Sequence, residues 1–193
     1  MPILDTLGQD HRAIEQLIGE LAGVRSDEPD RRVELFSQLQ AILQAHSRAE
    51  EEVVYRALRG ARPDEVEVLE AFEEHHVADV LLQELASACP GGRAWTAKVK
   101  VLEEVLRHHI KEEEQMIFPL VSERSGEAEQ ARMDQEFRLL RHEKLERALG
   151  PLRRATPAFA GRAAITAQAA AGRYIRRGEL FLRRRLGRLP ATA

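Results

Sequence analysis

The stretches "HSRAEEEVVYRAL" (residues 46–58) and "HIKEEEQMIFPLV" (residues 109–121) lie far apart in the 193-residue chain but repeat one pattern. In each, a histidine is followed four places later by a glutamate, and the two copies are offset by 63 residues throughout. Residues four apart on a helix lie one above the other on the same face. Each copy therefore predicts a helix that presents a nitrogen and an oxygen donor at one point.

A second pair of segments repeats in the same way. "DHRAIEQLIGELA" (10–22) aligns with "EHHVADVLLQELA" (74–86) at an offset of 64 residues. The alignment matches His11 with His75, so we expect His75 to face inward and His76 to lie one step round the helix. The chain thus contains two copies of a helix pair, and each copy contributes two histidines and one glutamate.

Apolar periodicity predicts the first two helices. The first helix carries an apolar stripe that includes a histidine: Leu4, Leu7, His11, Ile14, Ile18 and Leu21. The second stripe contains both donors of its motif, and its helix should end near residues 60–63: Leu35, Leu39, Ile42, His46, Glu50, Val53 and Ala57.

The next two helices complete the predicted fold. A third helix should span about residues 64–88 and end at "CPGG". A fourth should span about residues 93–118 and end at Pro119, with the stripe Leu102, Leu106, His109, Glu113 and Leu120. Four helices of similar length joined by short turns predict an all-α, up-down-up-down four-helix bundle.

The remainder of the chain differs in composition. We expect the bundle to occupy residues 1–122 and a helical, C-terminally basic extension of unknown role to occupy residues 123–193. The extension should contain an amphipathic helix at 126–149 and further helical segments in "AAITAQAAA" (163–171) and "RYIRRGELFLRRRL" (173–186).

Charge separates the two regions. The net charge is −3, but residues 151–193 hold ten arginines, no lysine and one acid and so carry +9, while the rest of the chain carries −12. The acidic body is not expected to bind nucleic acid. The basic helix should pack on this body, or contact a partner or an anionic membrane. A single cysteine and the lack of a signal-like start or an apolar span favour a cytoplasmic protein.

The inward-facing donors form the candidate site. All four predicted helices contribute: His11, His46, Glu50, His75, His109 and Glu113. An ionised glutamate in an apolar core is costly unless a cation compensates it, and bundles build metal sites from such residues. Four imidazoles and two bridging carboxylates suit two metal ions, iron first and then manganese or zinc. They leave room for an oxo or hydroxo bridge and an exogenous ligand.

Other polar residues have alternative roles. Asp79, four places after His75, is a further candidate ligand, whereas His76, His108 and His142 are expected outside the site. Tyr55 and Phe118 should close the ends of the core, and an aromatic near a diiron site can also control access.

The pattern H…H-x-x-x-E…H…H-x-x-x-E, in the blocks "DHR", "HSRAEEEVVY", "EEHH" and "HHIKEEEQMIFP", resembles the hemerythrin-like (HHE cation-binding) family over about residues 3–121. The resemblance implies a non-heme diiron centre held by the six residues above. The oxygen-carrying hemerythrins of marine invertebrates have a histidine where this chain has Asp79, and an aspartate five places after the fourth-helix histidine. The ligand set looks more like the branch with iron-cluster repair proteins and iron or oxygen sensors.

These observations predict a diiron protein that binds or reacts with O2, NO or peroxide in sensing or stress protection. An iron-handling role, in storage, delivery or cluster repair, is an alternative, as is a bundle whose basic tail binds a partner or membrane. The sequence lacks G-x-S-x-G, P-loop and H-E-x-x-H motifs. Any enzymatic activity would therefore rest on diiron reactivity.

Overall fold

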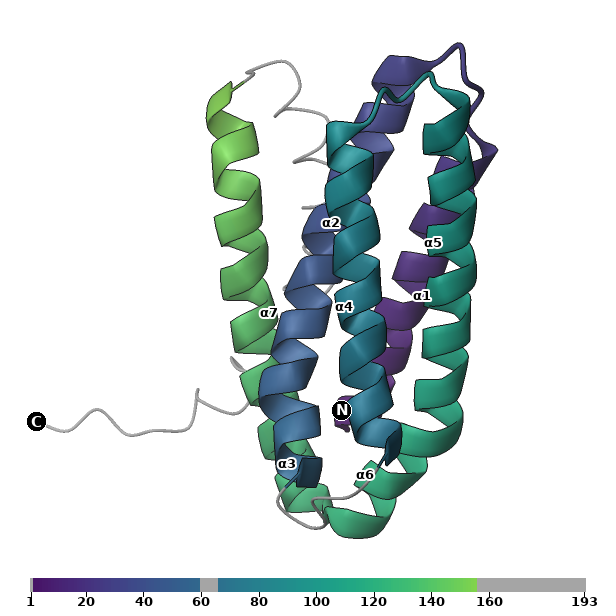
Figure 1. Ribbon diagram of the computed structural model, residues 1–193. Helices are drawn as coiled ribbons and strands as arrows, with labels where there is room; N and C mark the ends of the chain where they lie inside the picture. Colours follow the sequence, from purple (N-terminus) through teal and green to yellow (C-terminus); the bar gives the residue numbers. More distant parts are fainter. Residues whose placement is uncertain (1, 60–65, 156–193) are drawn as a thin grey trace, which may run out of the picture. The chain divides into compact units, whose positions relative to one another are not determined.

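Four long helices form the core of the molecule. The computed structural model describes residues 2–59 and 66–155. Helices α1 (Ile3–Gly23), α2 (Pro29–Glu50), α4 (Val66–Ser87) and α5 (Arg93–Glu112) lie side by side, each packed against the helix before and after it, and α5 packs against α1 (Figure 1). The described ranges contain no strand. The predicted all-α, up-down-up-down bundle is confirmed.

Both motif helices contain a π-helical turn that begins at the motif glutamate or at the residue after it. Helix α2 continues through η1 (Glu51–Tyr55) into α3 (Arg56–Arg59), and α5 continues through η2 (Glu113–Ile117) into α6 (Phe118–Arg124). A π-turn adds one residue to the helical repeat and is frequent at functional sites.

The π-turns shift the buried face by one residue. In the second helix Ala57 was expected in the core, but Ala57 is exposed and Leu58 is buried. In the fourth, Val121 is buried where Leu120 was expected to continue the stripe. The predicted stripes are correct through Val53 and Glu113. Beyond them Ala57 is exposed and Leu120 is only partly buried, because the extra residue rotates the following turns.

Pro119 does not end the fourth helix, contrary to the sequence prediction. It lies in the first turn of α6, which continues to Arg124. A proline is tolerated in a first helical turn because the missing N–H has no required acceptor there.

The donor residues interrupt an otherwise apolar core. On α1, Leu7 and Ile14 are buried on either side of His11, and on α5, Leu106 and Ile110 are buried beside His109. Burying aliphatic side chains contributes about 1.5–3 kcal/mol each and fixes which face of each helix points inward. The polar layer is therefore held in place by the apolar layers around it.

A buried arginine fastens the connections between helices. Arg32, only 3% exposed, donates hydrogen bonds to the carbonyl oxygens of Val24 and Pro90 and stacks over Trp95, with 5.1 Å between its guanidinium carbon and the ring centroid. Val24 follows α1 and Pro90 follows α4. The guanidinium thus joins two turns that precede the helices bearing the His–Glu motifs.

Helix α7 (Glu127–Ala155) adds a fifth long helix. The chain divides into two compact units, residues 1–148 and 149–193, so the first unit contains most of α7 as well as the bundle expected for residues 1–122. Within that unit Phe137 is completely buried. The predicted helices at 163–171 and 173–186 lie outside the described residues. In the part of the chain that is described, no helix combines the length and apolar character needed to cross a membrane.

Candidate metal centre

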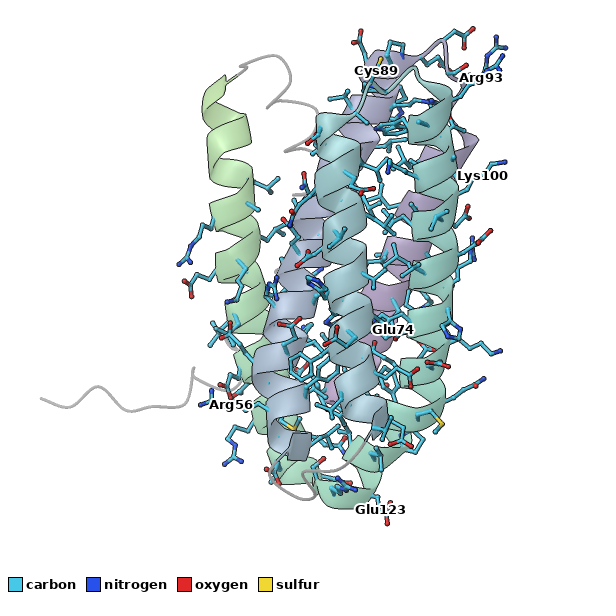
Figure 2. The ribbon with its side chains drawn as sticks, viewed as in Figure 1. Arg56, Glu74, Cys89, Arg93, Lys100 and Glu123 are labelled. Carbon is cyan, nitrogen blue, oxygen red and sulfur yellow. The ribbon has the colours of Figure 1, made fainter. Side chains whose placement is uncertain are left out.

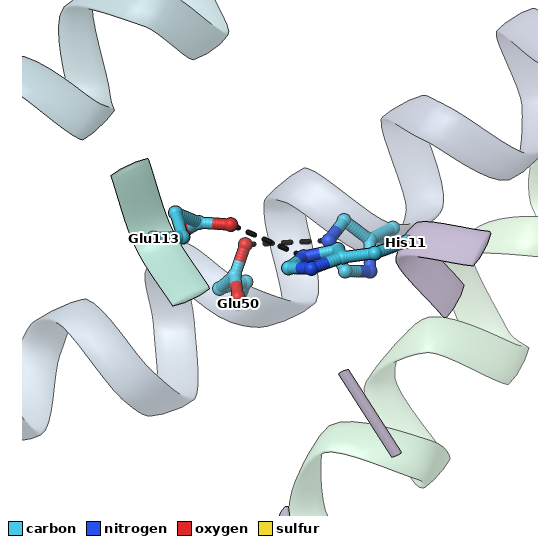
Figure 3. Close-up of side chains that lie close together, drawn as sticks. His11, Glu50 and Glu113 are labelled. Carbon is cyan, nitrogen blue, oxygen red and sulfur yellow. Dashed lines mark ion pairs between the residues drawn. The ribbon is translucent and has the colours of Figure 1, made fainter. Parts of the chain in front are cut away.

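The six predicted donors meet in the interior of the bundle. Helix α1 provides His11, α2 provides His46 and Glu50, α4 provides His75, and α5 with the first residue of η2 provides the pair His109 and Glu113. None of the six is more than 4% exposed. The carboxylate of Glu113 points toward the imidazole of His11, with which it forms an ion pair, and Glu50 lies beside it (Figure 3).

The donors divide into two overlapping groups. One consists of His11 and His46 with both glutamates, and the other of His75 and His109 with the same glutamates, Glu50 and Glu113. Within each group, one ligand atom per residue lies within 4.8 Å of all the others. This geometry is suited to two cations that share a pair of bridging carboxylates.

The Nε2 atom of every imidazole faces the shared carboxylates. Each of the four lies 3.1–3.7 Å from a glutamate Oε2 atom, and the pairs are His11–Glu113, His46–Glu50, His75–Glu50 and His109–Glu113. The Nε2 atoms of His75 and His109 are 3.0 Å apart. The four nitrogens therefore converge on the space between the glutamates.

The Nδ1 atom of every imidazole meets a second carboxylate. The pairs and distances are His11–Glu114 at 3.1 Å, His46–Asp10 at 3.3 Å, His75–Glu51 at 3.0 Å and His109–Glu74 at 2.8 Å. A carboxylate at Nδ1 holds the proton there, which leaves the Nε2 lone pair free to bind a metal and fixes the ring orientation.

This outer ring of carboxylates was not predicted from the sequence, although the internal repeat contained a signal for it. Asp10 and Glu74 each precede the histidine of a helix, and Glu51 and Glu114 each follow a motif glutamate. The acids recur at matching positions because each half of the repeat supplies the Nδ1 partners for both halves. Which imidazole each acid contacts depends on the packing of the helices.

Three of the four oxygens of the two buried glutamates lack a compensating hydrogen bond. Both oxygens of Glu50, Oε2 of Glu113 and Nε2 of His11 have no hydrogen-bond partner of good geometry. Buried charge without such bonds is costly, and a cation is the partner that carboxylate and neutral imidazole share. The residues present therefore fit a dinuclear metal centre.

With no metal bound, the charges of the site's own groups favour protonated imidazoles beside ionised carboxylates. Burial by itself lowers the pKa of His46, but Glu50 and Asp10 outweigh it and raise the pKa from 6.5 to about 10. The pKa of His109 is raised because Glu113 and Glu74 likewise outweigh burial. Burial opposes ionisation of Glu113, yet the neighbouring imidazoles hold its pKa far below the ordinary value. The site attracts positive charge.

Two aromatic residues at equivalent repeat positions border the site. The ring of Tyr55 stacks on His75 at 5.4 Å, and that of Phe118 stacks on His11 at 5.7 Å. The Tyr55 hydroxyl also donates a hydrogen bond to Oε1 of Glu113. Burial and the charge of Glu113 raise the pKa of the phenol well above its ordinary value, so Tyr55 stays a proton donor.

The other candidates lie outside the two donor groups. Asp79 forms an ion pair with Arg48 and is not part of either group. His76 and His142 are exposed, and His108 is 62% exposed. Tyr55 belongs to a buried apolar cluster and Phe118 packs against that cluster, and both rings also stack on imidazoles of the site.

Helix α7 covers the site on the side of α1 and α2. The ring of Phe137 meets His46 edge-on, with 5.7 Å between the centroids. Arg141 forms an ion pair with the buried Asp10, which is itself the Nδ1 partner of His46. The guanidinium of Arg141, on α7, thus contacts the carboxylate that orients the His46 imidazole.

The bundle and its paired donor groups define a helical protein with a buried cluster of histidines and glutamates that is suited to binding cations. The family model of the hemerythrin HHE cation binding domain matches residues 3–121, and the chain belongs to that family. The resemblance inferred from the sequence is thereby confirmed.

Two relatives extend this comparison. The fold is similar to that of a hemerythrin HHE cation binding domain-containing protein from Mycobacterium kansasii, with a TM-score of 0.70 and 22% identity over 84% of this chain and 99% of that one. A protein named DNA nickase from Nostoc sp. (strain PCC 7120 / SAG 25.82 / UTEX 2576) is 27% identical over 150 residues. The match covers 78% of this chain but only 42% of the nickase.

Proposed function

We propose that the protein holds two iron ions and uses them to bind or react with O2, NO or peroxide, in sensing or stress protection. The observation that carries the proposal is the pair of donor groups that share Glu50 and Glu113. His11 and His46 would complete one metal position, and His75 and His109 the other. Imidazole with carboxylate favours iron over softer or harder metals, with manganese and zinc as the next choices.

Bound iron would supply Lewis acidity and exchangeable electrons toward a small ligand. The protein's own residues orient the imidazole ligands and keep the site buried. Carboxylates at Nδ1 hold all four imidazoles with Nε2 inward, and aromatic rings pack on the imidazoles. Tyr55 holds a hydroxyl proton at Glu113 Oε1, where it can tune the basicity of that carboxylate.

Burial limits the size of the substrate. Each of the six donors is at most 4% exposed. A diatomic molecule or peroxide can reach such a centre through small openings, whereas a duplex phosphate cannot contact it while the bundle is folded. The net charge of −12 on residues 1–150 also disfavours the approach of nucleic acid. These features support a small ligand rather than DNA cleavage at this site. The relative named DNA nickase has additional length that this chain does not match.

A plasmid assay separates these possibilities. We expect the iron-loaded protein to leave supercoiled plasmid intact with Mg²⁺ or Mn²⁺ present. Nicking that disappears in the Glu50→Ala/Glu113→Ala variant would contradict a centre restricted to small ligands.

The direct test is elemental analysis of protein expressed in iron-supplemented cells, with visible spectra before and after exposure to air, NO and peroxide. We expect about two irons per chain and near-ultraviolet charge-transfer bands that respond to at least one of these ligands. Iron that is present but exchanges out within minutes would favour the iron-handling alternative. A colourless protein with no bound metal would refute the proposal.

A further inference from the structure

A pocket of about 140 Å³ lies between α4 and the α5–η2 segment. Five of its nine lining residues are glutamates, and none of these nine described residues is basic: the acids are Glu67, Glu70, Glu74, Glu112 and Glu113. Several carboxylates around one depression create a negative potential that concentrates cations near it.

One wall of this pocket belongs to the metal centre itself. Glu113 lines the pocket although it is only 1% exposed, and its Oε2 atom has no hydrogen-bond partner of good geometry. The same oxygen lies 3.1 Å from His11 Nε2 and 3.4 Å from His109 Nε2. The pocket is therefore bordered by a residue whose carboxylate is shared by both proposed metal positions.

A third donor group lies beside the pocket. Glu74, His108 and Glu112 offer three ligand atoms within 4.8 Å of one another, and both glutamates also line the pocket. His108 Nε2 is 3.3 Å from Glu112 Oε1 and 3.8 Å from Glu74 Oε1. His108 is 62% exposed and Glu112 is 39% exposed, so a cation held here would keep several water ligands.

Glu74 connects this outer group to the centre. It lies between α4 and α5 (Figure 2), and its second oxygen, Oε2, accepts the Nδ1 hydrogen bond of His109 at 2.8 Å. One residue thus contributes to the outer group and orients a ligand of the inner one.

We propose that Glu74, His108 and Glu112 form an acquisition site for a divalent cation, which then passes through the glutamate-lined pocket to the buried centre. The inference rests on the proposed function, since it needs a metal centre to fill. Two partly exposed carboxylates and one exposed imidazole bind a divalent metal weakly enough for onward transfer. On the α7 side, by contrast, the basic residues Arg138, Arg141 and Lys144 contact Thr6, Asp10 and Glu52 of the bundle.

Stopped-flow uptake of Co²⁺ by metal-free protein tests the proposal, because Co²⁺ acquires visible bands when it binds nitrogen and oxygen ligands. The test variant is His108→Ala/Glu112→Gln, which leaves Glu74 and the six inner donors unchanged. Its matched control is His76→Ala/Glu104→Gln, which removes one exposed histidine from α4 and one exposed glutamate from α5, away from the pocket.

We expect the test variant to take up Co²⁺ about tenfold more slowly than wild type, with a weaker dependence on ionic strength and an unchanged final Co²⁺ content. The control should match wild type. Equal rates in test and control variants would overturn the acquisition site while leaving the metal centre intact, as would a lower final content in the test variant alone. Wild-type protein that retains no Co²⁺ would overturn both proposals.

Discussion

The two halves of the internal repeat supply matching donors but have different surroundings. Around the α1–α2 half, Asp10 is 1% exposed, pairs with Arg141 and is covered by α7. Around the α4–α5 half, the equivalent residue Glu74 is 17% exposed and lines an acidic pocket. The repeat thus gives a nearly symmetric arrangement of donors. Helix α7 covers the α1–α2 side, whereas the α4–α5 side stays accessible at the pocket.

A second difference concerns the two shared carboxylates. Tyr55 donates a hydrogen bond to Glu113, whereas the equivalent repeat position is Phe118, which has no hydroxyl, and both oxygens of Glu50 lack a hydrogen-bond partner. A hydrogen bond lowers the basicity of a carboxylate. Glu50 and Glu113 are therefore not equivalent, although both are glutamates at matching positions of the repeat.

The largest effect is expected from removing what both halves share. The double substitution Glu50→Ala/Glu113→Ala should abolish retention of both metals, because each position loses two of its four protein donors. Elemental analysis after dialysis measures the loss, and circular dichroism should show unchanged helical content. A double variant that still retains two metals would refute the bridging role.

The next largest effect is expected at the two Nδ1 partners Asp10, on the side covered by α7, and Glu74, on the side of the pocket. Asp10→Asn and Glu74→Gln should each weaken metal binding by about 10–100-fold, since each alters an Nδ1 partner. Only Asp10→Asn should also destabilise the metal-free fold, by about 3 kcal/mol, because it removes a buried charge contacted by Arg141.

For Glu74→Gln the loss of stability should stay below about 1 kcal/mol, because that carboxylate is partly solvated. Urea denaturation with a chelator present compares the two variants. Equal losses of stability would show that α7 does not distinguish the two sides.

A smaller effect is expected from exchanging the aromatic residues. Tyr55→Phe should cost the metal-free protein about 1.5 kcal/mol, because Glu113 loses a buried hydrogen-bond donor. Phe118→Tyr is the reciprocal variant and tests whether a hydroxyl at the equivalent position can serve Glu50. In the metal-loaded protein, Tyr55→Phe should shift the charge-transfer bands without changing metal content. Identical spectra and stability would contradict a role for the hydroxyl.

The smallest effect concerns pH in the metal-free protein. The pKa of His46 is raised from 6.5 to about 10, so its stabilising contribution is complete below pH 6.5 and is lost as the pH rises toward 10. The pKa of Glu113 is lowered from 4.5, so its contribution is present above pH 4.5 and is lost in acid.

Stability of the metal-free protein should therefore be highest between about pH 4.5 and 6.5. Urea midpoints measured with chelator across this range and up to pH 10 provide the check. Metal affinity should rise with pH instead, because neutral imidazoles are the ligands. A midpoint that stays constant from pH 6.5 to 10 would argue against protonated His46 as a stabilising group.

The sequence predicted the bundle and the six inward donors because helical periodicity is a local property. Spacing of three and four residues decides which face of each helix is apolar, and that face contains His11, His46, His75 and His109. The π-turns were not predicted, since a single extra residue in a turn leaves no local pattern. For this reason Ala57 and Leu120 were assigned to the core in place of Leu58 and Val121.

The sequence by itself determined the fold class, the repeat and the donors that face the interior. Tertiary structure decided which carboxylate meets which imidazole, that Asp79 turns to Arg48, and that α7 covers one half of the centre while a pocket opens on the other. These contacts join residues from different helices, for example His11 with Glu114. Their geometry depends on how the helices pack, whereas the face of each helix depends only on residues within one or two turns.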